Sequence, residues 1–332
     1  MCVGGVNTPS KKKRKNFMQR SVVTVFGGNG FIGRELVRQL ASEGHLVRVA
    51  SRAPDKAASL VAQGPSGGIL PVYASVTDPS SVEAALNGAT AAINLVSILT
   101  ESGKARFKSI NAEAPGRVAQ LARRAGVTRF VQVSAIGAAP DAPSLYGKSK
   151  AEGEKRVRDA FPEATILRPS VVFGPQDRFL NMFGVMAKLL PVLPVYYPKT
   201  RLQPVYVEDV ATAARLCLTG EGSASDAGAR VFELGGPDQM SMEEIMAFVA
   251  RSVGRKPRLL AILNGVAMAQ ARIFENLPGK LLTRDQLAML GQDNIVTSGA
   301  ATLQTLGVVP QSVYDRAPEY LSQISVLRTL LN

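Results

Sequence analysis

One stretch, Ser21 to Arg52, constrains the fold of this 332-residue chain more than any other. It opens with the apolar run VVTVF, which is typical of a buried strand, and continues into a turn with four glycines. Apolar residues then recur at helical spacing in FIGRELVRQL, and the run LVRVA predicts a second strand. Strand, helix and strand in this order form a βαβ unit, so the sequence predicts a parallel sheet at its start.

The turn spaces three glycines as G-x-x-G-x-x-G, at Gly27, Gly30 and Gly33, with Gly28 beside the first. Glycine lets the backbone turn sharply and approach a pyrophosphate, and the N-terminus of the following helix offers unpaired N–H groups to phosphate oxygens. The spacing differs from G-x-G-x-x-G, so the prediction depends on the strand before the turn and the helix after it. In that context the turn predicts a dinucleotide site.

Ser51 and Arg52 stand where many dinucleotide-binding folds place an acidic residue that binds the ribose 2′-hydroxyl. A guanidinium suits a 2′-phosphate, so the sequence favours NADP(H) over NAD(H) as the cofactor. The alternative is that Arg52 is only a solvated loop charge.

Strands and helices keep alternating along the first half of the chain. The pattern predicts helices at 54–63 and 107–125, strands at 69–73, 91–99 and 129–134, and another helix opening at 141–150. We therefore expect an α/β fold with a doubly wound parallel sheet (Rossmann) over 21–180 and a smaller C-terminal α/β lobe over 181–332. Residues 204–236 are expected to return strands to the first sheet.

Tyr146 and Lys150 lie four residues apart in the segment DAPSLYGKSK. On a helix they share a face, so they can act together. A buried lysine ammonium close to a phenol lowers the pKa of that phenol, and Tyr146 would then exchange a proton with a substrate carbonyl or hydroxyl. The alternative is a surface pair without a chemical role.

The charge of the chain is concentrated at its start. Lys and Arg outnumber Asp and Glu by 39 to 26, and the run KKKRK lies within the first twenty residues. We expect residues 1–20 to be a disordered basic leader rather than a nucleic-acid patch, a nuclear address or a contact for anionic lipid, and we expect no nucleic-acid partner. Met18 precedes the fold, so residues 1–17 are interpreted as an upstream start, and no apolar core follows the run to indicate a cleaved signal.

Cysteine and histidine are too few to build a metal or disulfide site. Cys2 and Cys217 are far apart, and His45 is the single histidine. We therefore expect a reducing compartment and no metal, and Cys217 is interpreted as a packed core residue.

The segment KPRLLAILNGVAMAQARIFENLPGKLL, residues 256–282, is apolar with cations at both ends. We predict a helical stretch with a broad apolar face that includes Leu259, Leu260 and Ile273. Such a face either contacts a partner or a membrane interface, or is buried in the C-terminal lobe. No apolar run reaches the ~18 residues that a membrane-spanning helix requires.

Together, several stretches resemble the extended, or atypical, short-chain dehydrogenase/reductase superfamily. They are VFGGNGFIGRELV, INLVSIL, FVQVSAIGA, YGKSKAEGE, ILRPSVVFGPQD, QPVYVEDVA and LLTRDQLAMLGQDNIV. The last three make the chain similar to one subfamily in particular, that of the 39 kDa accessory subunit of respiratory complex I (NADH:ubiquinone oxidoreductase alpha subcomplex subunit 9), in its bacterial branch. The resemblance covers nearly all of the chain after the leader.

The resemblance implies a set of cofactor-binding positions. It implies that the cofactor turn is formed by Gly27, Gly30, Phe31, Ile32 and Gly33, that the adenosine phosphate is contacted by Arg52 beside Ser51, and that the ribose is lined by Asn94, Leu95 and Val96. It also implies that the family's helix asparagine is Asn111, that the catalytic pair is Tyr146 and Lys150, and that the strand beside the nicotinamide carries Arg168, Pro169 and Ser170.

The chain departs from the active enzymes at one position. They carry a Ser or Thr slightly later in the segment that is VSAIGA here, so Ser134 falls one place early and Ala135 stands where the hydroxyl is expected. Two hypotheses follow. In the first, the chain is an NADP(H)-binding accessory subunit or stability factor, bound to complex I subunits or to quinone-biosynthesis proteins, with peripheral membrane contact. In the second, it is an NADP-dependent reductase or epimerase acting on a lipid-like or quinone-like substrate, with Tyr146, Lys150 and Ser134 as catalytic residues.

The resemblance also implies a location. We expect the bacterial cytoplasm, at the cytoplasmic face of the inner membrane, or the matrix side of the membrane if the protein is mitochondrial.

Overall fold

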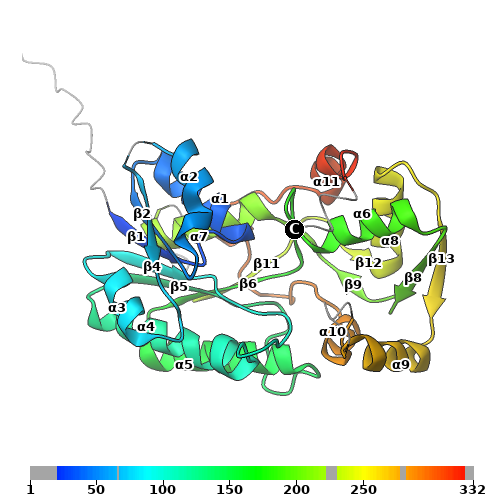
Figure 1. Cartoon of the computed structure of the whole chain (residues 1–332), viewed down its shortest axis with the longest axis horizontal. Coiled ribbons are helices and arrows are strands. Elements are labelled where there is room, and N and C mark those ends of the chain that lie inside the picture. The colour runs from blue at the N-terminus through cyan, green and yellow to red at the C-terminus, as the bar shows by residue number, and fades with distance from the viewer. Residues whose placement is uncertain (1–20, 66, 222–229, 277–281, 326–332) are drawn as a thin grey trace, which may run out of the picture.

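A computed structural model describes residues 21–65, 67–221, 230–276 and 282–325, and arranges them in two lobes side by side (Figure 1). The larger lobe contains a seven-stranded sheet in which every pairing is parallel. In sheet order the strands are β11 (Val231–Leu234), β6 (Thr165–Pro169), β5 (Arg129–Val133), β4 (Ala91–Asn94), β1 (Val22–Phe26), β2 (Leu46–Ser51) and β3 (Ile69–Tyr73). The strand order reverses between β1 and β4, which is where open α/β sheets bind ligands.

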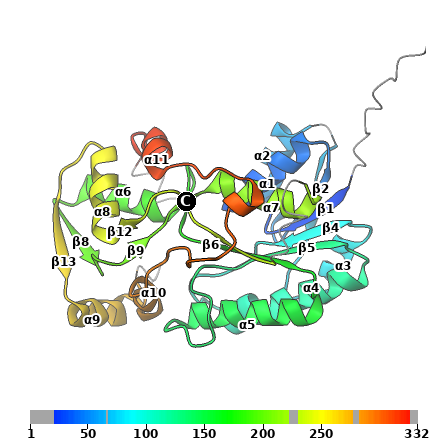
Figure 2. The same cartoon turned by 180° about the vertical axis from the view of Figure 1, so that it is seen from behind.

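Helices cover both faces of this sheet (Figures 1 and 2). One face carries α1 (Phe31–Ser42), α2 (Ala58–Gln63) with the 3₁₀ turn η1 (Pro54–Ala57) before it, and α7 (Val207–Thr219). The other face carries α3 (Pro79–Leu86), α4 (Ala114–Arg124) and α5 (Leu145–Ala160). Each layer buries its own apolar core against the sheet. The predicted doubly wound Rossmann fold is confirmed.

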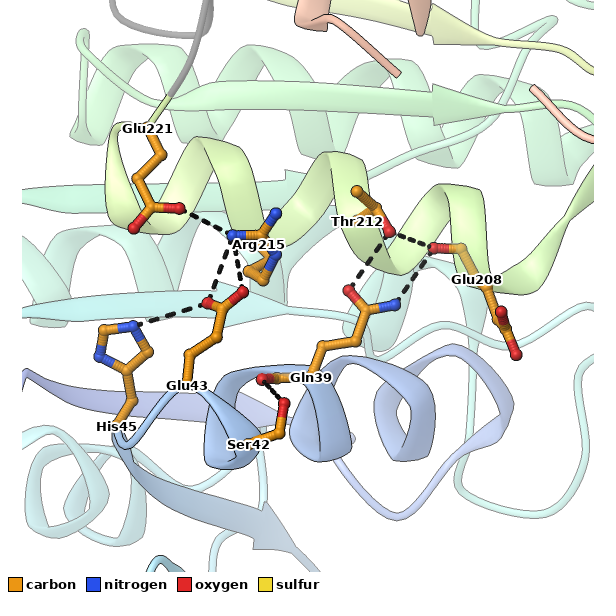
Figure 3. Close-up of polar contacts among 8 residues, drawn as sticks. All are labelled: Gln39, Ser42, Glu43, His45, Glu208, Thr212, Arg215 and Glu221. Carbon is orange, nitrogen blue, oxygen red and sulfur yellow. Dashed lines mark hydrogen bonds and ion pairs between the residues drawn. The ribbon is translucent and has the colours of Figure 1, made fainter. Parts of the chain in front are cut away.

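Helix α7 comes late in the chain but packs against α1, the helix that follows the glycine turn (Figure 3). Gln39 Nε2 of α1 donates to the backbone oxygen of Glu208 at 3.3 Å, and Arg215 of α7 pairs with Glu43 at 3.0 Å. Strand β11 also joins the large sheet, so residues that lie in the chain between segments of the smaller lobe complete the larger lobe. The domain boundary at residue 181 stays a prediction.

The smaller lobe has its own core. It is formed by α6 (Phe179–Leu189), α8 (Met242–Ser252) and α11 (Val313–Leu321), together with β8 (Val192–Tyr196), which pairs in parallel with β13 (Arg258–Ile262). Short pairings complete it: β7 (Val172–Phe173) with β10 (Val205–Tyr206), and β9 (Arg201–Leu202) with β12 (Met240–Ser241). Further helical elements after α8 are α9 (Asn264–Phe274), α10 (Arg284–Leu290) and the 3₁₀ turn η4 (Gln304–Leu306).

Strand β4 ends at Asn94, whereas the sequence predicts a strand as far as Leu99. Leu95 N–H still bonds the oxygen of Phe26, but the side chain of Asn94 then accepts the N–H of Val96 at 3.1 Å. A short polar side chain that captures a nearby backbone N–H competes with the strand ladder, so the backbone leaves the sheet at this point.

The helices predicted at 107–125 and from residue 141 also begin differently in the structure. The 107–125 helix opens with a π-helical segment, Lys108–Glu113, before α4. Helix α5 begins at Leu145, later than the predicted Asp141, because Pro143 disfavours helical backbone at the residue before it and Ser144 caps the helix by accepting the N–H of Gly147.

The apolar segment predicted as one helical stretch is a strand followed by a helix. Leu259 and Leu260 belong to β13, and the helix α9 begins only at Asn264. Pairing with β8 provides hydrogen-bond partners along one side of β13, and such a long-range contact cannot be read from periodicity. Among the described residues, no helix is long and apolar enough to span a membrane. The leader at 1–20 lies outside the described residues, as does the end of the apolar segment at 277–281.

Candidate functional site

The glycine turn after β1 is packed too tightly for side chains. Gly27 has a φ of +80°, and Gly30 N–H bonds its carbonyl oxygen at 2.9 Å. A Cβ atom on Gly33 would lie 2.4 Å from that same oxygen, and one on Gly27 would lie 3.3 Å from Cγ2 of Val96. The turn, the start of α1 and the residues after β4 therefore pack so closely that they leave no room for side chains at these glycines.

Helix α1 presents an open N-terminus to this place. It begins at Phe31, its N-cap is Gly30 without a capping side chain, and its first turn contains no acidic residue. The first N–H groups of a helix have no partner within the helix, and they carry the positive end of its dipole. The side chain of Phe31 packs on the core of the smaller lobe, and that of Ile32 packs on the cores of both lobes. The arrangement is suited to a phosphate.

Arg52 follows β2 at the same edge of the sheet. Its side chain is exposed and forms no hydrogen bond or ion pair with the described part of the chain. Ser51, by contrast, is buried, and its hydroxyl accepts N–H groups from Asn29 and Ala53 at 3.2 Å each. Asn29, which sequence reasoning missed although it lies within the GGNG turn, therefore ties the turn to the end of β2. Arg52 remains available to an anion, while Ser51 has an internal role.

The buried side chain of Asn94 fixes the end of β4 at the edge of the site. Its side chain is fully buried and donates to Gln132 of β5 at 3.0 Å, in addition to its bond with Val96. Leu95 and Val96 follow it and lie directly beside Gly27. The predicted trio is therefore brought to the glycine turn, with Asn94 holding the strand end in place.

Asn111 lies in the π-helical segment and fastens the loop after β4. Its side-chain oxygen accepts from Ser97 Oγ at 3.2 Å and from Ile98 N–H at 3.0 Å, and its amide donates to Ser149 of α5 at 3.3 Å. A single π turn within a helix is frequent at functional sites. This network places Ser97, which the sequence puts near the ligand-binding edge of the sheet, close to the phenol of Tyr146.

Tyr146 and Lys150 share the buried face of α5, as predicted from their spacing. Lys150 Nζ donates to the carbonyl oxygen of Val133 at 2.9 Å. Burial raises the pKa of Tyr146 to about 12, opposed only by a hydrogen bond with Ser97. Burial likewise lowers the pKa of Lys150 to about 8. The predicted lowering of the pKa of the phenol is therefore wrong for this arrangement, because desolvation of the phenolate dominates.

Ser134 directly follows β5, next to Val133, whose oxygen accepts the bond from Lys150. Its side chain is buried, and its hydroxyl oxygen has no hydrogen-bond partner among the described residues. A buried polar group without a partner is uncommon, because its desolvation costs about 1–3 kcal/mol. Together with the glycine turn and the open end of α1, this hydroxyl makes a site whose groups fit a dinucleotide and a polar atom beside it.

Arg168 has other partners. From β6 its guanidinium forms two bonds to the buried Glu154 of α5, at 2.9 and 2.7 Å, and approaches Glu233 of β11 at 3.5 Å. Pro169 is buried and pairs with Leu234. Arg168 therefore connects α5 to the sheet, and its role beside a nicotinamide stays a prediction.

Comparison with known proteins agrees with this geometry. A family profile described as NAD(P)H-binding matches residues 27–176. The mitochondrial NADH dehydrogenase (ubiquinone) 1 alpha subcomplex subunit 9 of Arabidopsis thaliana is 33% identical over 314 residues, which are 91% of this chain and 77% of the relative. A ceramide reductase of Caulobacter vibrioides is 32% identical over 254 residues, 73% of this chain and 74% of the relative.

Solved structures share the fold. The triphenylmethane reductase of Citrobacter sp. superposes with a TM-score of 0.68 at 16% identity, covering 90% of this chain and 99% of that one. The larger lobe therefore contains an NAD(P)H-binding profile match over residues 27–176, and the structural likeness extends over both lobes.

Proposed function

Because the chain belongs to the family of the alpha subcomplex subunit 9 of NADH:ubiquinone oxidoreductase, we propose that it is an NADP(H)-binding accessory subunit or stability factor. Its partners are the subunits of respiratory complex I or the proteins of ubiquinone biosynthesis. It acts at the membrane surface, on the cytoplasmic face of a bacterial inner membrane or the matrix side in a mitochondrion.

The observation that carries the proposal is the contrast between two ends of the site: the phosphate end, at the glycine turn and the start of α1, and the chemical end, at Tyr146 and Lys150. The glycine turn and the uncapped start of α1 are ready for a pyrophosphate, and Arg52 is free for a 2′-phosphate. At the chemical end, burial raises the pKa of Tyr146 to about 12, so the phenol stays protonated at neutral pH and is unsuited to act as a general base. The site therefore supports nucleotide binding directly, and it supports turnover only in the direction in which Tyr146 donates a proton. A nucleotide whose free concentration is 100 times its dissociation constant stabilises the folded state by about 2.7 kcal/mol.

Replacing Arg52 tests the preference for NADP(H). Arg52→Ala should weaken NADPH binding by about 10- to 100-fold, since hydrogen bonds to charged groups contribute about 1.5–3 kcal/mol, and should leave NADH binding within about threefold. Arg124→Ala removes an exposed cation at the end of α4, on the opposite edge of the sheet, and is the matched control. Equal losses for NADPH and NADH in Arg52→Ala would rule out the 2′-phosphate contact.

A reductase is the second candidate, favoured by the unpartnered hydroxyl of Ser134. The nicotinamide, when bound, would supply a hydride to a carbonyl carbon. Tyr146, protonated at neutral pH, would donate its proton to the carbonyl oxygen, and Ser134 would position that oxygen. A phenol with a raised pKa suits this reducing direction and not the reverse. The substrate class is lipid-like or quinone-like, in keeping with the ceramide reductase among the relatives.

Tyr146→Phe separates the two candidates. If the protein is an accessory subunit, the variant keeps its nucleotide and its partners, and NADPH oxidation by the purified protein with quinone or ceramide-type carbonyl substrates is absent in both forms. A loss of NADPH oxidation of 100-fold or more in the variant would instead favour the reductase.

A further inference from the structure

The segment TRDQLAMLGQDN, Thr283 to Asn294, belongs by position to the smaller lobe but reaches the nucleotide-binding lobe at both ends. We name it the clamp segment. It contains α10, which lies on the same side of the molecule as α5 in both views (Figures 1 and 2). The function proposed above assigns it no role.

At one end, Asp285 caps the helix that carries Tyr146. Its carboxylate accepts the N–H of Leu145 at 2.5 Å and that of Tyr146 at 3.1 Å. The third N–H of α5, from Gly147, is taken by Ser144 Oγ at 3.0 Å. The start of α5 is therefore fully capped, and two of its three N–H groups are held by a residue about 140 positions away in the chain.

The position of Asp285 strengthens this contact. It also lies in the first turn of α10, where it faces the positive end of that helix. One carboxylate thus stabilises the dipoles of two helices from different lobes. Within the described part of the chain, no side chain caps the N-terminus of helix α1, so the two helix starts that border the site differ: one is open, and the other is closed by the clamp segment.

At the other end, Asn294 bonds the loops that follow β5 and β6. Its side-chain oxygen accepts from Ser170 Oγ at 2.6 Å, and its amide donates to the carbonyl oxygen of Ile136 at 3.3 Å. Ser170 follows β6, and Ile136 lies two residues after Ser134. The clamp segment therefore touches the site from the side of α5 and from the ends of β5 and β6.

Between its two ends, the clamp segment packs through α10 against α9, a helix that precedes it in the chain. Leu287 of α10 is buried against Ala267 and Ala271, the two residues that α9 buries. Arg284 also bonds Glu275 just after α9, at 2.8 Å. Movement of α10 relative to α5 would accordingly be passed to α9, which exposes Val266, Met268 and Ile273.

We propose that the clamp segment couples the nucleotide site to the α9 surface, and that Asp285 is the positioning residue through which the coupling acts. The proposal rests on the nucleotide binding proposed above. A nucleotide lying between the glycine turn and Tyr146 restrains the start of α5, and Asp285 transmits that restraint to α10 and α9. Since coupling between two sites is reciprocal, a partner bound at α9 would tighten nucleotide binding by the same factor.

The test compares Asp285→Asn with Asp238→Asn in the full chain. Asp238 is a matched control because it also accepts a distant helix-start N–H, that of Val313 at 2.9 Å, but in α11, which carries no site residue. Amide hydrogen exchange is followed at residues 145–147 and 284–290, with and without NADPH, and the dissociation constant of NADPH is measured from its fluorescence.

In the wild type, NADPH should slow exchange in α10 although no residue of α10 is placed in the glycine turn. Asp285→Asn should abolish that slowing and weaken NADPH binding by about 5- to 10-fold, a typical coupling factor, whereas Asp238→Asn should change binding less than twofold. Slowing of α10 that persists in Asp285→Asn, or equal effects of both variants, would overturn the coupling alone. A wild type that bound neither NADPH nor NADH would overturn the proposed function, and the coupling with it.

Discussion

Lys150 keeps its amino group inside the protein, where Nζ bonds the oxygen of Val133. Burial lowers its pKa to about 8 from an ordinary value of 10.5, and the nearby Glu154 only partly opposes the shift. Between these two pH values the unfolded chain binds more protons than the folded one. The contribution of Lys150 to stability therefore rises as the pH increases from about 8 to 10.5.

Lys150→Met should remove this dependence. Between pH 8 and 10, the wild type should gain about 2 kcal/mol of unfolding free energy relative to the variant, as measured by urea unfolding at each pH. The comparison stops at pH 10 because the raised pKa of Tyr146 lowers stability above that pH. Lys148→Met, at an exposed position of the same helix, should follow the wild-type profile. Parallel profiles for Lys150→Met and the wild type would contradict the buried-lysine account.

Local sequence predicted the site residues that depend on local geometry. The glycine turn, Arg52 at the strand end and the shared face of Tyr146 and Lys150 all follow from spacing along one element. The state of those residues depends on distant parts of the chain. The pKa of the phenol is set by burial, and the partners of Arg168 come from α5 and β11, which spacing does not disclose.

At the scale of elements, Arg168 joins helix α5 to strands β6 and β11. Glu154, which accepts its two bonds, is 2% exposed. Breaking a buried ion pair from one side leaves a charge without its partner, and this costs about 3–5 kcal/mol.

Arg168→Met should therefore lower the unfolding free energy by about 3 kcal/mol. The loss should lie at the lower end of the range because Arg158 still bonds Glu154 at 2.7 Å. Arg156→Met breaks a comparable pair with Glu152 that is exposed on the same helix, and should cost less than about 1 kcal/mol. Urea unfolding measures both, and similar losses in the two variants would show that the buried pair does not join these elements.

The elements that sequence reasoning predicted well are those with strong periodicity. The predicted strands at 69–73 and 129–134 and the first βαβ unit agree with the structure within a residue. The segment at 256–282 failed because the pairing of β13 with β8 joins residues about 66 positions apart, and its leucines suit a strand or a helix equally. The capping of α5 by Asp285 was invisible for the same reason.

At the scale of the whole molecule, the smaller lobe exposes apolar side chains along β13, along α9 and at the residue between these two elements. They include Leu260, Leu263, Val266 and Ile273, and Leu263 is 77% exposed. Exposed cations border them at Lys256, Arg258 and Arg272. An apolar surface with a basic rim is suited to contact with a partner complex at an anionic membrane.

Leu263→Asp should reduce the amount of protein that co-purifies with membranes at least threefold, because it places a carboxylate between the exposed apolar side chains of β13 and those of α9. Val309→Asp makes the same change at another fully exposed position, 85% exposed, and should leave membrane association unchanged. Because both side chains are exposed, neither variant should unfold. Equal retention of both variants on membranes would exclude α9 as the contact.

The most direct test of the central claim, that the chain holds NADP(H) as part of its structure, is mass spectrometry of the nucleotide released when the purified full-length protein is denatured. We predict about one NADP(H) per chain, with the same amount released from Tyr146→Phe, because retention does not depend on turnover. Release of NAD(H) alone, or of no nucleotide from protein purified without added cofactor, would contradict the claim.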